Sequence, residues 1–126
     1  MKFGLLGRTL GHSFSPHIHS VLGNTNYELF EREPSQLQEF FDDPELQGIN
    51  ITFPYKVNAL ETCDVVDPRA ERIGCVNTMV RKDGKWHGYN TDYDGFVFTL
   101  EHAGINVSGK ECIILGDGAS SATVHV

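Results

Sequence analysis

Strand-like runs alternate with helical patterns along most of this chain, and this alternation limits its fold more than any other feature. Strands are expected at residues 2–7, 26–32, 48–52 and 110–115. Helices are expected at residues 15–22, 33–41, 54–60, 68–73 and 91–103. Such alternation predicts an α/β fold with a mostly parallel sheet flanked by helices.

One connection departs from this alternation. Residues 75–81 and 85–89 are both strand-like, and only Lys82-Asp83-Gly84 separates them. Asp-Gly between two such runs favours a tight β-turn. We therefore expect one antiparallel hairpin in the sheet.

The chain divides near its C-terminal end. Residues 1–104 are expected to form one domain. Residues 105–126 combine a linker, a strand, a glycine-rich turn and the start of a helix. One strand and one helix cannot cover both faces of a parallel sheet, so we interpret this part as the opening of an incomplete second domain.

Composition restricts the partners. The net charge is −7, whereas phosphate contacts need clustered Lys and Arg, so nucleic acid is not an expected partner. No apolar run reaches the roughly 18 residues of a membrane span. His17 and His19 point apart on a helix, so no metal site is expected. The three cysteines form no CxxC pair, which favours reduced thiols and a cytoplasmic location.

The run Asn50-Ile51-Thr52-Phe53-Pro54-Tyr55-Lys56 is the strongest candidate for a site. It places two neutral hydrogen-bonding side chains and one cation at the C-terminal end of an expected strand, where open α/β sheets bind ligands. Lys56 could exchange a proton there. The alternative is a solvated surface lysine.

Other polar residues have both a structural and a ligand-binding interpretation. Ser15 can cap a helix, which leaves Ser13 free to face a ligand. Strands disfavour Asn, so Asn77 is expected to have a specific hydrogen-bonding role, either structural or toward a ligand.

The segment Gly88 to Gly95 also has two interpretations. Thr91 can cap the following helix, with Asp92 and Asp94 stabilised by the helix dipole. Alternatively, Asp92 pairs with Lys56 across a pocket, and Asn90 and Thr91 add ligand donors.

Four segments together resemble the shikimate dehydrogenase family, in its order and spacing: residues 7–16, 50–56, 73–78 and 88–95. The resemblance implies NADP-dependent, reversible reduction of 3-dehydroshikimate to shikimate in aromatic amino-acid biosynthesis. It implies a small-molecule substrate and permits a homo-oligomer. Quinate as substrate with NAD as cofactor, or a binding module without catalysis, are the alternatives.

The resemblance also implies residue roles. Lys56 and Asp92 would be catalytic. Substrate would contact Ser13, Ser15, Asn50, Thr52, Lys56, Asn77 and Asp92, the two serines holding its carboxylate. After an expected strand, the turn at Gly116, Gly118, Ala119 and Ser120 would bind cofactor.

Two departures from the family pattern bear on these roles. Asp117 and Ala119 stand where the family typically has Ala and Gly, and an acidic side chain there opposes an anion. Family members are also roughly twice as long. Residues 1–104 would be the substrate domain and 105–126 the start of the NAD(P) domain, so this chain should bind substrate without turnover.

Overall fold

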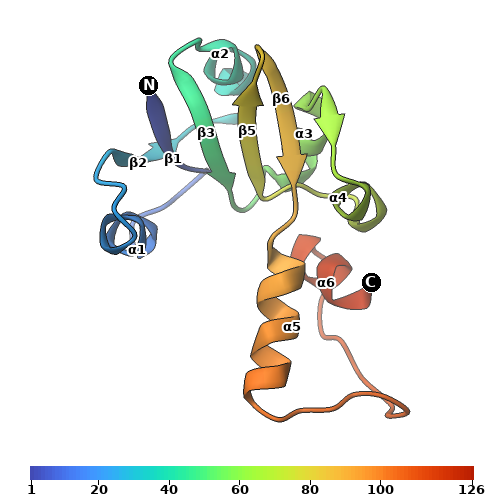
Figure 1. The fold of residues 1–126 in the computed structure, drawn as a ribbon. Helices are drawn as coiled ribbons and strands as arrows, with labels where there is room; N and C mark the ends of the chain where they lie inside the picture. Colours follow the sequence, from blue (N-terminus) through green and yellow to red (C-terminus); the bar gives the residue numbers. More distant parts are fainter.

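A computed structural model of residues 1–126 shows a six-stranded mixed sheet with helices packed against it (Figure 1). The strand order is β2-β1-β3-β5-β6-β4. The pairs β1–β2, β1–β3 and β4–β6 are parallel, whereas β3–β5 and β5–β6 are antiparallel. The strands are β1 (Lys2–Gly7), β2 (Tyr27–Glu31), β3 (Leu46–Ile51), β4 (Val65–Val66), β5 (Thr78–Lys82) and β6 (Lys85–Tyr89).

The α/β class and the hairpin are both confirmed. Asp83 and Gly84 join β5 to β6 with φ angles of 51° and 76°, the left-handed conformation that a tight hairpin turn requires. The two-residue strand β4 was not predicted, because so short a run has no detectable period.

Six α-helices and one 3₁₀ turn connect or follow the strands. They are α1 (Ser15–Val21), the 3₁₀ turn η1 (Pro34–Gln36), α2 (Leu37–Asp42), α3 (Lys56–Thr62), α4 (Pro68–Ile73), α5 (Asp92–His102) and α6 (Ala119–His125). The predicted start of α3 at Pro54 was early by two residues, because Thr52 to Tyr55 form a turn closed by a hydrogen bond from Tyr55 N to Thr52 O. None of the helices combines the length and hydrophobicity that crossing a bilayer requires.

Most of the core lies on one face of the sheet. Sheet residues such as Leu6, Ile49 and Trp86 pack there against Phe40 and Phe41 of α2 and against residues of α3 and α4. A smaller cluster on the other face contains Leu5, Leu10 and Tyr27. The first cluster holds 14 buried residues and the second three, so the sheet is anchored mainly from one side.

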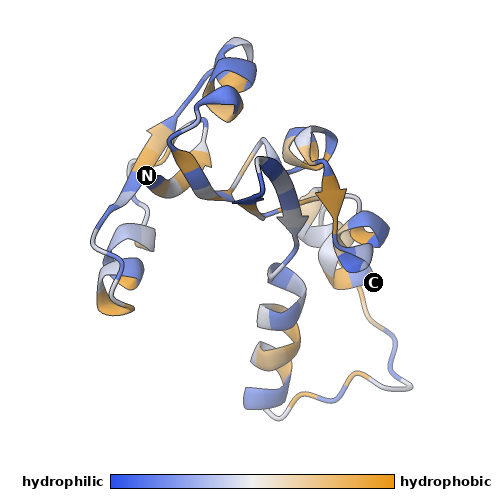
Figure 2. Cartoon of the chain, turned by 45° about the horizontal axis from the view of Figure 1, so that its top comes forward, coloured by the Kyte–Doolittle hydropathy of each residue, from blue (hydrophilic) through white to orange (hydrophobic).

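Residues 103–118, the C-terminal segment, run apart from the sheet (Figures 1 and 2) and are all exposed. The strand predicted at residues 110–115 is absent: Ile113 and Leu115 are 87% and 94% exposed. The backbone N–H of Lys110 donates to Val107 O, and no strand lies beside the segment. That prediction was wrong because an apolar run becomes a strand only where a neighbour completes its hydrogen bonds.

Candidate active site

The predicted site residues converge on the carboxyl end of the sheet, where β1, β3 and β6 end and β5 begins (Figure 1). Ser13 follows β1, Lys56 follows β3, Asn77 precedes β5 and Asp92 follows β6. Parallel strands and one antiparallel hairpin thus bring together residues that lie up to 79 positions apart in sequence.

Lys56 and Asp92 form an ion pair. The Lys56 ammonium lies 2.5 Å from Asp92 Oδ2. The side chain of Lys56 is only 14% exposed and that of Asp92 is 38% exposed, so the cation is partly withdrawn from water. The predicted pairing across the site is therefore present. Such a pair holds an ammonium in one place, where it can deliver a proton to a bound oxygen.

Asn77 links the start of β5 to the start of α5. Its Oδ1 accepts from the backbone N–H of Thr91 at 2.9 Å, and its Nδ2 donates to Asp92 Oδ1 at 2.9 Å. Nδ2 also donates to Thr91 Oγ1 at 2.9 Å. Asn77 is 8% exposed. In this structure Asn77 therefore fixes the carboxylate that holds Lys56, which is a structural role, and its contact with a ligand stays a prediction.

The start of α5 is capped by Asn90 and not, as predicted, by Thr91. Asn90 Oδ1 accepts from the backbone N–H groups of Asp92 and Tyr93, at 3.1 and 3.4 Å. The Thr91 hydroxyl faces Asn77 instead and makes no cap bond. Asn90 is 4% exposed, so it is placed to orient the catalytic candidate Asp92 and not to contact a ligand.

Ser13, and not Ser15 as predicted, provides the hydroxyl that bonds the backbone at the start of α1. Ser15 is the first residue of α1, and Ser13 Oγ accepts its backbone N–H at 3.2 Å. Ser13 also lines a cavity of about 370 Å³ together with His12 and Thr52. Its hydroxyl can therefore serve the turn and still face a ligand, because a hydroxyl has a donor and two acceptor positions.

Thr52 is a wall of two neighbouring cavities. One is the cavity beside Ser13. The second, of about 410 Å³, reaches Lys56 on one side and the turn at Gly116, Gly118, Ala119 and Ser120 on the other. The residues predicted to bind cofactor thus lie across a cavity from the proposed proton donor.

A buried polar cluster attaches α6 to this end of the sheet. Asn90 Nδ2 lies 3.2 Å from Cys75 O and 3.5 Å from the Thr123 hydroxyl, and Cys75 Sγ lies 3.8 Å from Ala119 O. Burial raises the pKa of the Cys75 thiol, against smaller opposing effects of Thr123 and Lys56. The thiol is therefore a neutral packing group behind the ion pair.

Sequence reasoning missed two residues that contact the site. The Tyr27 hydroxyl donates to Asn50 Oδ1 at 2.8 Å, and Asn50 Nδ2 donates to Thr78 Oγ1 at 3.1 Å. Burial raises the pKa of Tyr27 to about 12, with Ser15 acting in the opposite direction. Asn50 and Thr78 are register partners on β3 and β5, which no local pattern reveals.

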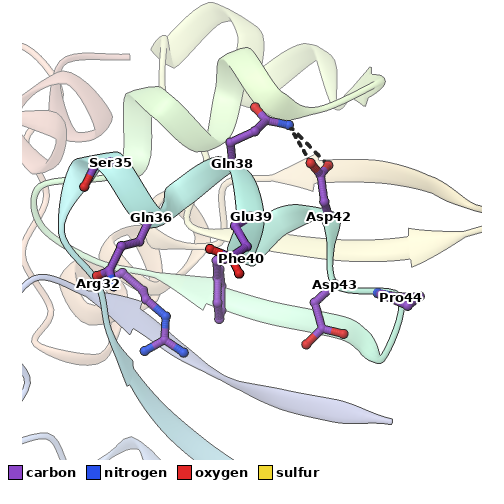
Figure 3. A pocket seen from close by; sticks show the side chains of 9 residues that line it. All are labelled: Arg32, Ser35, Gln36, Gln38, Glu39, Phe40, Asp42, Asp43 and Pro44. Atoms are coloured by element: carbon purple, nitrogen blue, oxygen red, sulfur yellow. Dashed lines mark hydrogen bonds between the residues drawn. The ribbon is translucent and has the colours of Figure 1, made fainter.

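The largest cavity, about 920 Å³, lies elsewhere, along α2 (Figure 3). Two of its acidic residues are already engaged: Asp43 pairs with Lys2, and Asp42 accepts from Gln38. None of the predicted site residues lines it.

Comparison with known proteins assigns the family. A profile described as the shikimate dehydrogenase substrate binding domain matches residues 5–79. The chain belongs to the shikimate dehydrogenase family.

Curated relatives agree with this family assignment. The NADP-dependent shikimate dehydrogenase of Clostridium perfringens is 38% identical over 130 residues, which cover 97% of this chain and 48% of that protein. The enzyme of the same name from Caldicellulosiruptor bescii is 39% identical over 132 residues, which cover 95% and 45%. The chain spans about half the length of these relatives.

Solved shikimate dehydrogenase structures share the fold. Shikimate dehydrogenase 1 from Peptoclostridium difficile superposes with a TM-score of 0.90 at 38% identity, covering 99% of this chain and 51% of that one. The Thermus thermophilus enzyme, in complex with NADP(H) and shikimate, superposes with a TM-score of 0.88 at 34% identity, covering 98% and 50%.

Proposed function

We propose that this chain supplies the substrate site and acid–base pair of an NADP-dependent shikimate dehydrogenase, which reversibly reduces 3-dehydroshikimate to shikimate. The observation that carries the proposal is the Lys56–Asp92 ion pair at the carboxyl end of the sheet. Its setting in a chain of this family supports the substrate class. Residues 1–104 form the substrate domain in this proposal, and residues 105–126 begin the nucleotide domain.

The proposed chemistry assigns the proton to Lys56. When a ketone carbon gains hydride, negative charge builds on its oxygen, and a held ammonium stabilises that charge and donates the proton. Asp92 holds the Lys56 ammonium in place. In the oxidation direction the neutral amine accepts the proton.

The remaining predicted residues orient the substrate in this proposal. Ser13 and Ser15 donate hydroxyl hydrogen bonds to its carboxylate. Asn50, Thr52 and Asn77 lie near its ring hydroxyls. Orientation by several such groups converts binding energy into a productive approach of the reacting atoms.

The backbone of the turn before α6 suits the binding of a dinucleotide. Gly116 has φ 125°, a conformation that side chains disfavour, and it lines the cavity that reaches Lys56. NADP, when bound, would supply the hydride. Gly116, Gly118, Ala119 and Ser120 would hold it through backbone N–H groups.

Titration of the 126-residue chain with shikimate, followed by two-dimensional NMR, tests the proposal. Backbone amide shifts are expected to change at Ser13, Ser15, Thr52, Lys56 and Asp92. A Ser13→Ala variant should bind more weakly, and Ser35→Ala, an exposed serine on η1, should bind as the parent does. Saturable shifts only along α2 would reject the site. Tighter binding of quinate than of shikimate would reassign the substrate.

We further propose a cytoplasmic location for the protein. The support is its three free cysteines, of which Cys112 is exposed. An exposed thiol persists in a reducing compartment. Labelling of intact and lysed cells with a membrane-impermeant thiol reagent tests this, since Cys112 should react only after lysis.

A further inference from the structure

Hydrogen bonds connect Tyr27 to Asp92 in an unbroken chain across four elements. Tyr27 on β2 contacts Asn50 on β3, Asn50 contacts Thr78 on β5, Thr78 contacts Asn77, and Asn77 contacts Asp92. All of the donor–acceptor distances lie between 2.8 and 3.1 Å. No buried side-chain nitrogen or oxygen in the molecule lacks a hydrogen-bond partner.

The donor-to-acceptor direction of these hydrogen bonds is fixed at the Asn77 end of the series. A backbone N–H can only donate, and that of Thr91 points at Asn77 Oδ1, so the other amide atom of Asn77 must be the nitrogen. This nitrogen faces Asp92, which can only accept when ionised. The orientation of Asn77 therefore follows from its neighbours.

The orientation of Asn77 in turn determines the orientation of Asn50, because the hydroxyl of Thr78 lies between them. This hydroxyl faces Asn77 Oδ1 at 3.0 Å, so its one proton is donated there. It must then accept from Asn50, which places Asn50 Nδ2 toward Thr78 and Oδ1 toward Tyr27. The Tyr27 hydroxyl must donate in turn.

We propose that Thr78 and Tyr27 are positioning residues for substrate binding, because their hydroxyls fix the side-chain amide of Asn50 so that it offers the ligand an N–H donor. This inference rests on the proposed function. The second hydrogen on Asn50 Nδ2 is the free one, since the first is bound by Thr78. Asn50 lines a cavity of about 200 Å³ together with Tyr27 and Thr78, and there it would recognise an acceptor oxygen of the substrate. The raised pKa of Tyr27, about 12, agrees with a phenol that stays protonated and donates.

Three variants distinguish the effect of each hydroxyl from the effect of side-chain size. Thr78→Val removes a hydroxyl at constant shape and frees the Asn50 amide to turn over, so shikimate should bind about 3- to 10-fold more weakly. Tyr27→Phe leaves the Thr78 bond in place and should cost about 2- to 5-fold. Thr78→Ser keeps the hydroxyl and should stay within about 2-fold of the parent chain.

Tyr89→Phe is the matched control. Tyr89 is the register partner of Thr78 on β6, but its hydroxyl contacts Lys82 and lies outside the chain of hydrogen bonds. It should bind shikimate as the parent does. Equal weakening by Thr78→Val and Thr78→Ser would overturn the proposal, because a variant that keeps the hydroxyl would then be as impaired as one that lacks it.

A second readout needs no ligand. In the parent chain, the side-chain amide of Asn50 should give two well-separated proton resonances, one slowed in exchange by its bond to Thr78. Thr78→Val should remove that protection at Asn50 and leave the amide protons of Asn77 protected, since these bond Thr91 and Asp92 and not Thr78. Unchanged Asn50 resonances would overturn the inference. If the parent chain binds no shikimate, the proposed function fails, and this measurement still decides the positioning role.

Discussion

The carboxyl end of the sheet and the C-terminal segment have opposite environments. At the carboxyl end of the sheet, Asn77 is 8% exposed and makes hydrogen bonds to residues of two other elements. In the C-terminal segment, Ile113 is 87% exposed and no strand lies beside it. The difference shows that a strand-like or polar sequence sets which structure a segment can adopt. Whether the segment adopts it depends on neighbouring backbone that can complete its hydrogen bonds.

The largest contrast should appear in catalysis. In a protein that joins this chain to a complete nucleotide domain, Lys56→Ala should lower kcat by about 10²- to 10⁴-fold, because the proton donor is lost. Lys85→Ala, at an exposed lysine on β6, should leave kcat unchanged. Steady-state reduction of 3-dehydroshikimate, followed as NADPH oxidation, measures both. A Lys56→Ala enzyme with near-parent kcat would show that another group supplies the proton.

Stability should differ between the two regions as sharply as exposure does. Leu46 is fully buried, whereas Leu115 is 94% exposed. Leu46→Ala should lower the free energy of unfolding by about 2–5 kcal/mol through lost burial and a cavity. Leu115→Ala should change it by less than about 0.5 kcal/mol. Urea unfolding measures both, and equal losses would mean that the C-terminal segment packs in solution.

Thiol chemistry offers a third contrast. Burial raises the pKa of Cys63 to about 11, and the adjacent charge of Asp64 adds to this. A raised pKa leaves less thiolate at pH 8, and thiolate is the reactive form. Cys112 is exposed. Alkylation by iodoacetamide at pH 8, followed by mass spectrometry, should modify Cys112 at least about 10-fold faster than Cys63. Faster reaction at Cys63 would contradict its burial.

The smallest effect is expected at the glycine turn. Asp117 is exposed beside the backbone proposed to hold NADP, and its charge opposes an anion. Asp117→Ala in the longer protein should tighten NADPH binding by about 2- to 5-fold. Glu101→Ala, which removes one exposed charge from α5, controls for net charge. Weaker binding in Asp117→Ala would show that the carboxylate contacts the cofactor favourably.

The Lys56–Asp92 pair was predictable, because strand ends in an α/β sheet converge and only a few polar residues follow each strand. The partners of Asn50 were not, because Tyr27 and Thr78 reach it through sheet register. The cap of α5 was assigned to Thr91 and belongs to Asn90, since adjacent polar residues compete for one role and packing decides between them. The strand predicted at residues 110–115 does not form, because no neighbouring strand completes its hydrogen bonds.

Gly7, the last residue of β1, stands where there is little space for a side chain. A methyl group there would lie 2.8 Å from Thr52 Cγ2 and 2.6 Å from Leu10 Cδ2, both on residues that line the cavity beside Ser13. Gly11 and Gly95 have nothing within 4 Å of the same position. Alanine should therefore be accepted more readily at residues 11 and 95 than at residue 7, where the side chains of Leu10 and Thr52 would have to move and the cavity would change shape.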